Sequence, residues 1–185
     1  MEDSIQNIID ALSSGRVILY PTDTIWGLGC DINSLEAIYK IYDIKKRPLH
    51  KPFIVLVSDI DMLKNYVKDI HPRIETLLLY HKRPLTIIYK NAKNVPDILT
   101  KNGSIAIRIV KEPMIAKIIK LFGKAIVSTS ANISDKPFPQ NFATIDPQII
   151  KAVDYIFKYK QGDYSEAIPS VIATYNKNGK LKFFR

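Results

Sequence analysis

Apolar residues occur either at helical spacing or in short continuous runs, and this pattern predicts an α/β fold. Ile5, Ile8, Ile9 and Leu12 follow the i, i+3, i+4, i+7 spacing of a helix over 4–14. The same reasoning predicts helices over 34–45, 59–66, 72–81, 114–122 and 146–152. Apolar runs predict strands over 16–20, 53–57, 85–89, 104–110, 125–127, 155–157, 171–175 and 181–184.

The order of these elements predicts a twisted sheet with flanking helices. Strands and helices alternate, which is typical of the α/β class. Asn178-Gly179 separates the last two strands and is a strong signal for an antiparallel hairpin, so we expect a mixed sheet. A chain of 185 residues without linker or repeat is most economically a single domain over 1–185.

Residues 18–52 have the order of an anion site. An apolar run leads into a hydroxyl-rich turn at Thr22-Asp23-Thr24, a Gly-x-Gly, a helix over 34–45 with Leu35, Ile38, Tyr39 and Tyr42 along its inner face, and a cation cluster stiffened by prolines. The cluster consists of Lys45, Lys46, Arg47 and Lys51. Gly27 and Gly29 lack the third glycine of a dinucleotide fingerprint, so we interpret them as turn geometry.

Two further polar groups follow or interrupt apolar strands. Arg108 lies in the middle of an apolar strand and needs an anionic partner, unless that strand is at an edge with Arg108 facing water. Residues 128–132, Ser-Thr-Ser-Ala-Asn, offer hydroxyls, an amide and backbone N–H groups in what we expect to be one tight turn. Such a turn can hold phosphate or carboxylate oxygens, although an ordinary connecting turn has the same composition.

Composition and charge narrow the function classes. The chain has 27 Lys and Arg against 18 Asp and Glu, a net charge of +9, which favours a polyanionic partner or reflects solvated lysine-rich helices. The single cysteine, Cys30, excludes a disulfide framework and indicates a reducing compartment. With no signal peptide and no apolar run of membrane-spanning length, we expect a cytoplasmic protein with no membrane partner.

Several familiar chemistries are missing from the sequence. It contains no Walker A motif, no Cys/His zinc spacing and no nucleophile elbow. What remains is a site of hydroxyls and cations without an obvious nucleophile. That composition suits a reaction between anionic substrates, catalysed by positioning and charge neutralisation.

Four segments in order then point to a family: PTDTIWGLGCD (21–31), KKRPLHKP (45–52), SIAIRIV (104–110) and STSAN (128–132). With these motifs, and over about 18–185, the chain closely resembles the short, single-domain members of the YrdC-like family of L-threonylcarbamoyladenylate synthases. The resemblance implies a concave, positively charged cavity. It implies that L-threonine, bicarbonate and ATP condense to threonylcarbamoyl-adenylate and pyrophosphate, with Mg²⁺ accompanying the ATP. A downstream transferase complex would then make N6-threonylcarbamoyladenosine in tRNA, and tRNA itself is a candidate partner.

The resemblance also implies site residues, carried over motif by motif. The threonine-site residues would be Thr24, Arg108, Ser128 and Ser170, with Arg108 taking the carboxylate. The ATP-site residues would be Arg47, Lys51, Ser104, Ser130, Asn132 and Arg185. The catalytic cations would be Lys45, Arg47 and Lys51, of which Lys45 is a supporting cation. We expect no metal ligands from the protein.

The chain departs from the family pattern at three places. Arg83 stands for a glycine in the usual P-G-P-L-T loop, Asp135 stands for a glycine after STSAN, and Val171 and Thr174 replace a threonine and an aspartate near the end. Two other functions remain open: an RNA-binding module, suggested by the charge, and a paralogue that acts on another carbamoyl adenylate.

Overall fold

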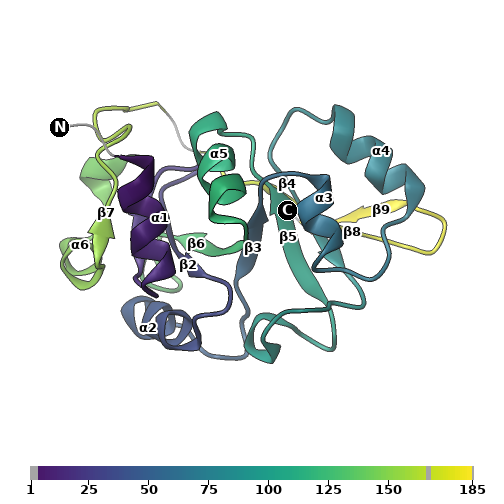
Figure 1. Ribbon diagram of the computed structural model, residues 1–185, viewed down its shortest axis with the longest axis horizontal. Helices are drawn as coiled ribbons and strands as arrows, with labels where there is room; N and C mark the ends of the chain where they lie inside the picture. Colours follow the sequence, from purple (N-terminus) through teal and green to yellow (C-terminus); the bar gives the residue numbers. More distant parts are fainter. Residues whose placement is uncertain (1–3, 166–167, 185) are drawn as a thin grey trace.

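The computed structural model describes residues 4–165 and 168–184, which form one nine-stranded sheet with helices packed on it (Figure 1). The helices are α1 (Ile5–Ser13), α2 (Leu35–Lys45), α3 (Ile60–Lys64), α4 (Pro72–Tyr80), α5 (Pro113–Phe122) and α6 (Pro147–Ala152). The strands are β1 (Ile18–Tyr20), β2 (Gly27–Asp31), β3 (Ile54–Val57), β4 (Leu85–Tyr89), β5 (Ile105–Ile109), β6 (Ile126–Ser130), β7 (Tyr155–Ile156), β8 (Val171–Tyr175) and β9 (Leu181–Phe183).

The strand order is β7-β1-β2-β6-β3-β5-β4-β8-β9. The pairs β1/β7, β3/β5 and β4/β8 are parallel, whereas the other neighbours are antiparallel. The predicted mixed sheet is therefore confirmed, as is the hairpin that joins β8 to β9. Because β5 lies in the interior of the sheet, the alternative that Arg108 belongs to an edge strand is wrong.

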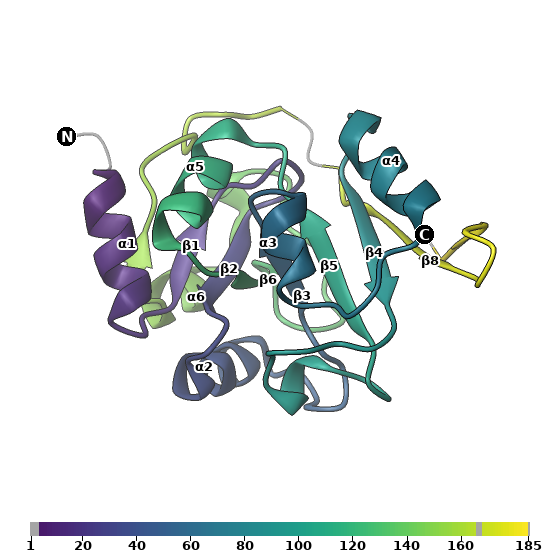
Figure 2. The ribbon, with the colours of Figure 1, turned by 45° about the vertical axis from the view of Figure 1, so that its right-hand side comes forward.

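One face of the sheet carries a row of helices, and the other face is left for the site. Figures 1 and 2 show α1, α5, α3 and α4 side by side in front of the strands. Helix α5 follows its predicted pattern, with four buried residues on one side and Gly123 ending it in the left-handed region at φ 76°. Within the described residues, no helix is long and apolar enough to cross a membrane.

Helix α2 begins as the sequence predicts but faces the core with a different side. Ser34 caps it, since its hydroxyl oxygen accepts a hydrogen bond from the N–H of Ala37. The prediction that Leu35 and Tyr39 lie on the inner face is wrong, because they are 49% and 44% exposed. Of the predicted inner residues only Ile38 and Tyr42 are buried, and they are joined there by Ala37, Ile41 and Lys45.

The interpretation of Gly27 and Gly29 as a turn is wrong, because both glycines lie inside strand β2. Neither has a positive φ, and what they provide is space. A Cβ on Gly29 would lie 2.8 Å from the Tyr20 ring and 2.8 Å from the carbonyl oxygen of Val127. A Cβ on Gly27 would lie 3.1 Å from the carbonyl oxygen of Thr129. Glycine is needed here so that neighbouring groups can approach the strand closely.

Residues 128–130 likewise belong to strand β6, although the sequence predicted that residues 128–132 form one tight turn. The strand pairs with β2 on one side and β3 on the other, and only Ala131 and Asn132 lie beyond its end. Strand geometry sends Ser128 and Ser130 to one face and Thr129 to the other. The hydroxyls of this motif are therefore divided between the two sides of the sheet.

Candidate functional site

A cavity of about 520 Å³, here named the first cavity, lies on the sheet face opposite the helix row. Its floor comes from one continuous face of neighbouring strands. Arg108 on β5 pairs with Leu56 on β3 and with Thr86 on β4, and Ser128 on β6 pairs with Ile54 on β3. Residues opposite one another in paired strands share a face. Seven of the predicted site residues line this cavity: Thr24, Arg47, Arg108, Ser128, Ser130, Asn132 and Ser170.

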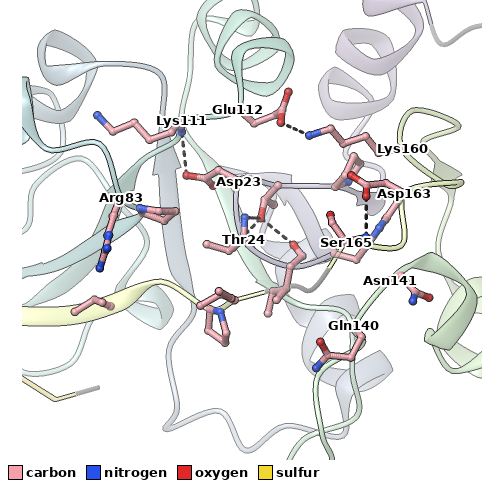
Figure 3. A pocket seen from close by; sticks show the side chains of 18 residues that line it. Asp23, Thr24, Arg83, Lys111, Glu112, Gln140, Asn141, Lys160, Asp163 and Ser165 are labelled. Carbon is pink, nitrogen blue, oxygen red and sulfur yellow. Dashed lines mark hydrogen bonds and ion pairs between the residues drawn. The ribbon is translucent and has the colours of Figure 1, made fainter.

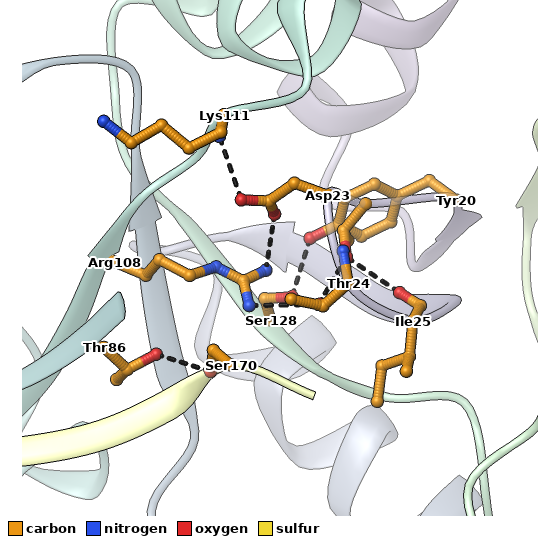
Figure 4. A network of polar contacts seen from close by, with 10 residues as sticks. Tyr20, Asp23, Thr24, Ile25, Thr86, Arg108, Lys111, Ser128 and Ser170 are labelled. Carbon is orange, nitrogen blue, oxygen red and sulfur yellow. Dashed lines mark hydrogen bonds and ion pairs between the residues drawn. The ribbon is translucent and has the colours of Figure 1, made fainter. Parts of the chain in front are cut away.

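Arg108 is the most buried cation on the cavity floor, with 5% of its surface exposed. Its Nη1 donates to Thr24 Oγ1 at 3.0 Å, and its Nη2 lies 3.1 Å from Asp23 Oδ1 (Figure 4). Burial lowers the pKa of Arg108, and the charge of Asp23 opposes that shift. Within the described residues, Arg108 Nε has no hydrogen-bond partner. Because Arg108 also lines the first cavity, its guanidinium can bind an acceptor oxygen there.

The turn between β1 and β2 holds Arg108 in place. Asp23 Oδ2 accepts a hydrogen bond from the backbone N–H of Lys111 at 3.0 Å, which ties the turn to the residues after β5. Thr22 Oγ1 donates to the carbonyl oxygen of Ile25 and lies 2.8 Å from Thr24 Oγ1. The anionic partner that the sequence required for Arg108 is therefore Asp23, a residue of this chain.

Two buried hydroxyl groups outside the cavity lining form hydrogen bonds with two serines that line the first cavity. Tyr20 donates its hydroxyl hydrogen to Ser128 Oγ at 2.8 Å, and Thr86 Oγ1 lies 2.9 Å from Ser170 Oγ (Figure 4). Sequence reasoning missed Tyr20 and Thr86, since both belong to apolar runs that indicate only core strands. They are fully buried and do not line the cavity.

Lys45 lies behind the cavity wall and holds the end of β6. It is 1% exposed, and its Nζ donates to the carbonyl oxygens of Ser130 at 2.5 Å and of Asn132 at 2.6 Å. Burial, with a smaller contribution from the charge of Arg47, lowers the pKa of Lys45 to about 7. This lysine fixes the backbone that carries Ser130 and Asn132, and it is not among the residues lining the cavity.

Asn132 is held at the rim of the same cavity by its amide nitrogen. Its Nδ2 donates to the carbonyl oxygens of Ile133 at 3.0 Å and Lys136 at 2.6 Å. Its Oδ1 is buried and has no hydrogen-bond partner within the part of the chain that the structure describes. The side chain therefore has an unused acceptor at the end of the β6 motif.

Arg47 lines the first cavity and is fixed by its own loop. Its Nε donates to the carbonyl oxygen of Lys51 at 2.8 Å, its Nη2 donates to that of Pro52 at 3.2 Å, and its guanidinium carbon lies 5.3 Å from the centre of the Phe53 ring. Burial lowers the pKa of Arg47. The proline-stiffened loop thus fixes the direction of one cation, as its sequence predicted.

Three of the predicted site residues lie away from the lining of the first cavity. Lys45 lies behind the wall, and Lys51 is exposed with its Nζ 3.5 Å from Asp135 Oδ1. Ser104 donates to the carbonyl oxygen of Lys101 in the turn before β5. A fourth, Arg185, lies outside the described residues.

Asp135 has a φ of 64°, a left-handed conformation that explains why a glycine fits this position.

A second cavity of about 780 Å³ adjoins the first, and the two share Thr22, Thr24, Ile25 and Pro169 (Figure 3). Arg83 and Lys111 line it on one side, and a partly buried ion pair between Glu112 and Lys160, 2.6 Å apart, lines it on another. The sequence did not predict this cavity, because its walls come from several segments that share no motif. Arg83, which replaces a family glycine, is one of its cations.

The lining of the first cavity defines a class of anion-binding protein. Its described lining contains two arginines, a lysine, hydroxyls and an amide, and no carboxylate. An α/β protein with such a lining is built to bind anionic ligands on the open face of its sheet.

Comparison with known proteins identifies the family. Residues 10–185 match the model of the Sua5/YciO/YrdC family, which is described as "Telomere recombination". The chain is 31% identical over 166 residues to a threonylcarbamoyl-AMP synthase of Xanthomonas campestris, covering 87% of this chain and 88% of the relative. It is 34% identical over 139 residues to a threonylcarbamoyl-AMP synthase of Escherichia coli, covering 73% of each. The chain therefore belongs to the Sua5/YciO/YrdC family.

Solved structures show the same fold at low sequence identity. The structure of P. abyssi Sua5 complexed with L-threonine matches with a TM-score of 0.83 at 24% identity, covering 98% of this chain and 53% of that one. E. coli YciO matches with a TM-score of 0.81 at 24% identity, covering 98% and 87%. The chain thus spans about half the length of the Sua5 chain and most of the YciO chain. The predicted YrdC-like fold is confirmed.

Proposed function

We propose that this protein is a threonylcarbamoyl-AMP synthase, which condenses L-threonine, bicarbonate and ATP. The observation that carries the proposal is the first cavity itself. Motifs far apart in the sequence bring Arg108, Arg47, Ser128 and Asn132 to one cavity whose described lining has no carboxylate. The relatives with this name support the same activity, since they match over most of the chain.

Threonine would occupy the part of the first cavity around Arg108. Its carboxylate would accept hydrogen bonds from the guanidinium, whose Nε is unused among the described residues. Thr24, Ser128 and Ser170 lie around this part of the cavity and supply hydroxyl groups. Charge-assisted bonds to a buried arginine are among the stronger polar contacts, which suits recognition of a small zwitterion.

ATP would occupy the part of the cavity between Arg47 and the end of β6. Ser130 and Asn132 would contact the nucleotide and its phosphates, and Arg47 would neutralise phosphate charge. Lys51, Ser104 and Arg185 remain proposed nucleotide contacts by motif alone. Lys45 would contribute indirectly, by holding the backbone of Ser130 and Asn132.

The chemistry follows from charge. The amine of threonine attacks bicarbonate to form a carbamate with loss of water, and a carbamate oxygen then attacks the α-phosphorus of ATP. The bond between the α-phosphorus and the α,β-bridging oxygen breaks, and that oxygen leaves as part of pyrophosphate. Two anions must approach each other, so Arg47 and Arg108 lower their repulsion by holding one charge each. Fixing both substrates in one cavity supplies the orientation.

Magnesium is proposed to arrive bound to ATP. The described residues contain no cluster of three His, Cys, Asp or Glu side chains that could hold a metal, and the first cavity has no carboxylate in its described lining. This donor set does not fit a resident Mg²⁺ ion held by protein ligands. It fits a metal that is coordinated mainly by substrate phosphates and water, which is common for Mg²⁺.

The product is a mixed anhydride, and a separate transferase must consume it. We propose that it supplies the threonylcarbamoyl group for N6-threonylcarbamoyladenosine in tRNA, and that tRNA and the transferase complex are partners of the pathway. The protein's +9 charge is compatible with a tRNA nearby.

Pyrophosphate release with each substrate omitted in turn tests the proposal. Release should require threonine, bicarbonate and ATP together. Arg47→Ala should lower the rate by about tenfold to more than a hundredfold, because a charge-assisted hydrogen bond contributes roughly 1.5–3 kcal/mol. Arg73→Ala is the matched control, since Arg73 is an exposed arginine on α4. Release that does not depend on threonine would contradict the proposal.

A further inference from the structure

Tyr20 is buried beside the first cavity, on the same face of the sheet. It is the last residue of β1, is fully buried and pairs with Gly27, which in turn pairs with Ser130. Its ring crosses over Gly29, where a Cβ would lie 2.8 Å from Tyr20 Cε1 and 3.3 Å from its hydroxyl oxygen. Because Gly29 has no side chain, the Tyr20 side chain on β1 can extend across β2 and reach β6.

The group that Tyr20 reaches is Ser128. Its hydroxyl donates to Ser128 Oγ at 2.8 Å, and Ser128 lines the first cavity opposite Gly29 in the sheet. Phe157 packs against the Tyr20 ring with a centroid distance of 5.8 Å. Figure 4 shows the hydroxyl pointing at Ser128, close to the Arg108 network. The tyrosine is thus fixed on both sides and aimed at one cavity residue.

This contact decides which way Ser128 can hydrogen bond. A serine hydroxyl has one proton and two acceptor lone pairs, and Tyr20 occupies one lone pair. Among the residues that the structure describes, no acceptor receives the Ser128 proton, so that proton is available to the cavity. Burial raises the pKa of Tyr20 far above its ordinary value, and the phenol therefore keeps its donor proton at any working pH.

We propose that Tyr20 is a positioning residue that fixes Ser128 as a hydrogen-bond donor to an acceptor oxygen of the bound amino acid. The inference rests on the proposed function, because it takes the surroundings of Arg108 and Ser128 as the amino-acid subsite. Ser170 lacks this constraint, since in its contact with Thr86 either hydroxyl can donate. Ser128 can therefore bind only a hydrogen-bond acceptor of the ligand, whereas Ser170 can bind either a donor or an acceptor.

The test is the Tyr20→Phe variant, which removes one oxygen and keeps the ring. With saturating ATP and bicarbonate, the KM for threonine should rise about threefold to tenfold, the effect of one neutral hydrogen bond, with kcat and the KM for ATP little changed. Ser128→Ala should raise the threonine KM similarly, and the double variant should be no worse than Ser128→Ala alone. Tyr89→Phe is the matched control, a buried tyrosine on β4 that lines neither cavity.

The results of these assays distinguish failure of this inference from failure of the proposed function. A wild-type protein that releases no threonine-dependent pyrophosphate contradicts the proposed function. If the wild type is active, an unchanged threonine KM in Tyr20→Phe overturns the inference, and so do effects of Tyr20→Phe and Ser128→Ala that multiply independently. Equal rises in the KM for threonine and for ATP would show a merely structural role. Should Tyr20→Phe fail to fold, an unchanged threonine KM in Ser128→Ala still overturns the inference.

Discussion

Arg108 combines a structural ion pair with a proposed role in ligand binding. Its charge is compensated by Asp23 inside the protein, and the same side chain lines the first cavity. Breaking a buried ion pair by removing one partner leaves an uncompensated charge, which costs more than the pair contributes. Structural and binding roles of Arg108 can therefore be separated only if Asp23 is neutralised as well.

For Arg108→Met we expect a loss of about 3–5 kcal/mol in unfolding free energy, because Asp23 is left charged and buried. The double variant Asp23→Asn, Arg108→Met should regain most of that stability in urea unfolding. It should still show no threonine-dependent pyrophosphate release. A stable double variant that retains threonine-dependent turnover would exclude Arg108 from the amino-acid subsite.

At the scale of elements, strand β2 and the end of β6 shape the cavity through their backbones. The two glycines keep one face of β2 bare, and Lys45 from α2 holds two carbonyl groups at the end of β6. Gly29 and Lys45 do not line the first cavity, so their substitution should disturb the site without removing any group that touches a ligand.

Gly29→Ala should lower the unfolding free energy by about 1–3 kcal/mol, the usual cost of overpacking. The new Cβ would meet both the Tyr20 ring and the backbone oxygen of Val127, and the latter cannot move without disturbing β6. Gly162→Ala is the control, because nothing lies within 4 Å of its Cβ position and its φ is not positive. Urea unfolding of both variants measures the difference, and equal stabilities would contradict this account of β2.

Lys45 should make stability depend on pH. Its pKa falls from 10.5 to about 7 on folding, so between these values the unfolded chain binds one more proton than the folded chain. The unfolding free energy should therefore rise with pH from 7 toward 10.5, by up to about 1.4 kcal/mol per pH unit, and the cost of the buried charge is fully present below pH 7. Comparison with Lys45→Met isolates this contribution, and parallel pH profiles for the two proteins would refute it.

These elements also show how far the sequence could predict the molecule. Long apolar runs and helical spacing located β3, β5, α1 and α5 correctly, because burial on one or two faces leaves a clear pattern. Strand β2 was missed because its glycines contribute no apolar side chains to one face. The pattern could not reveal the contact between Tyr20 and Ser128, which are 108 residues apart.

The motifs predicted which residues gather in one cavity, but they did not predict the place of Lys45 or the second cavity. Residues of all four motifs do meet in the first cavity, among them Thr24, Arg47, Arg108 and Ser128. The position of Lys45 behind the wall depends on how α2 packs against the end of β6, which is tertiary information. The second cavity is assembled from segments without a shared motif, and no local pattern signals such a surface.

At the scale of the whole molecule, the sheet separates stability from function. Helices cover one face and bury the core (Figure 1). The opposite face carries Arg108 on β5 and Ser128 on β6, two strands separated by β3 (Figure 4). The net charge of +9 adds a long-range attraction for ATP and other anions that depends on ionic strength. The family relationship agrees with this division, since its matched region includes every motif of the site.

The central claim is that one cavity joins threonine, bicarbonate and ATP. The most direct test incubates the protein with ¹³C-bicarbonate, L-threonine and ATP and identifies the nucleotide product by mass spectrometry. The account predicts threonylcarbamoyl-adenylate that carries the label in its carbamoyl carbon, formed with one pyrophosphate per product. An unlabelled adenylate, or AMP and pyrophosphate formed equally well without threonine, would contradict it.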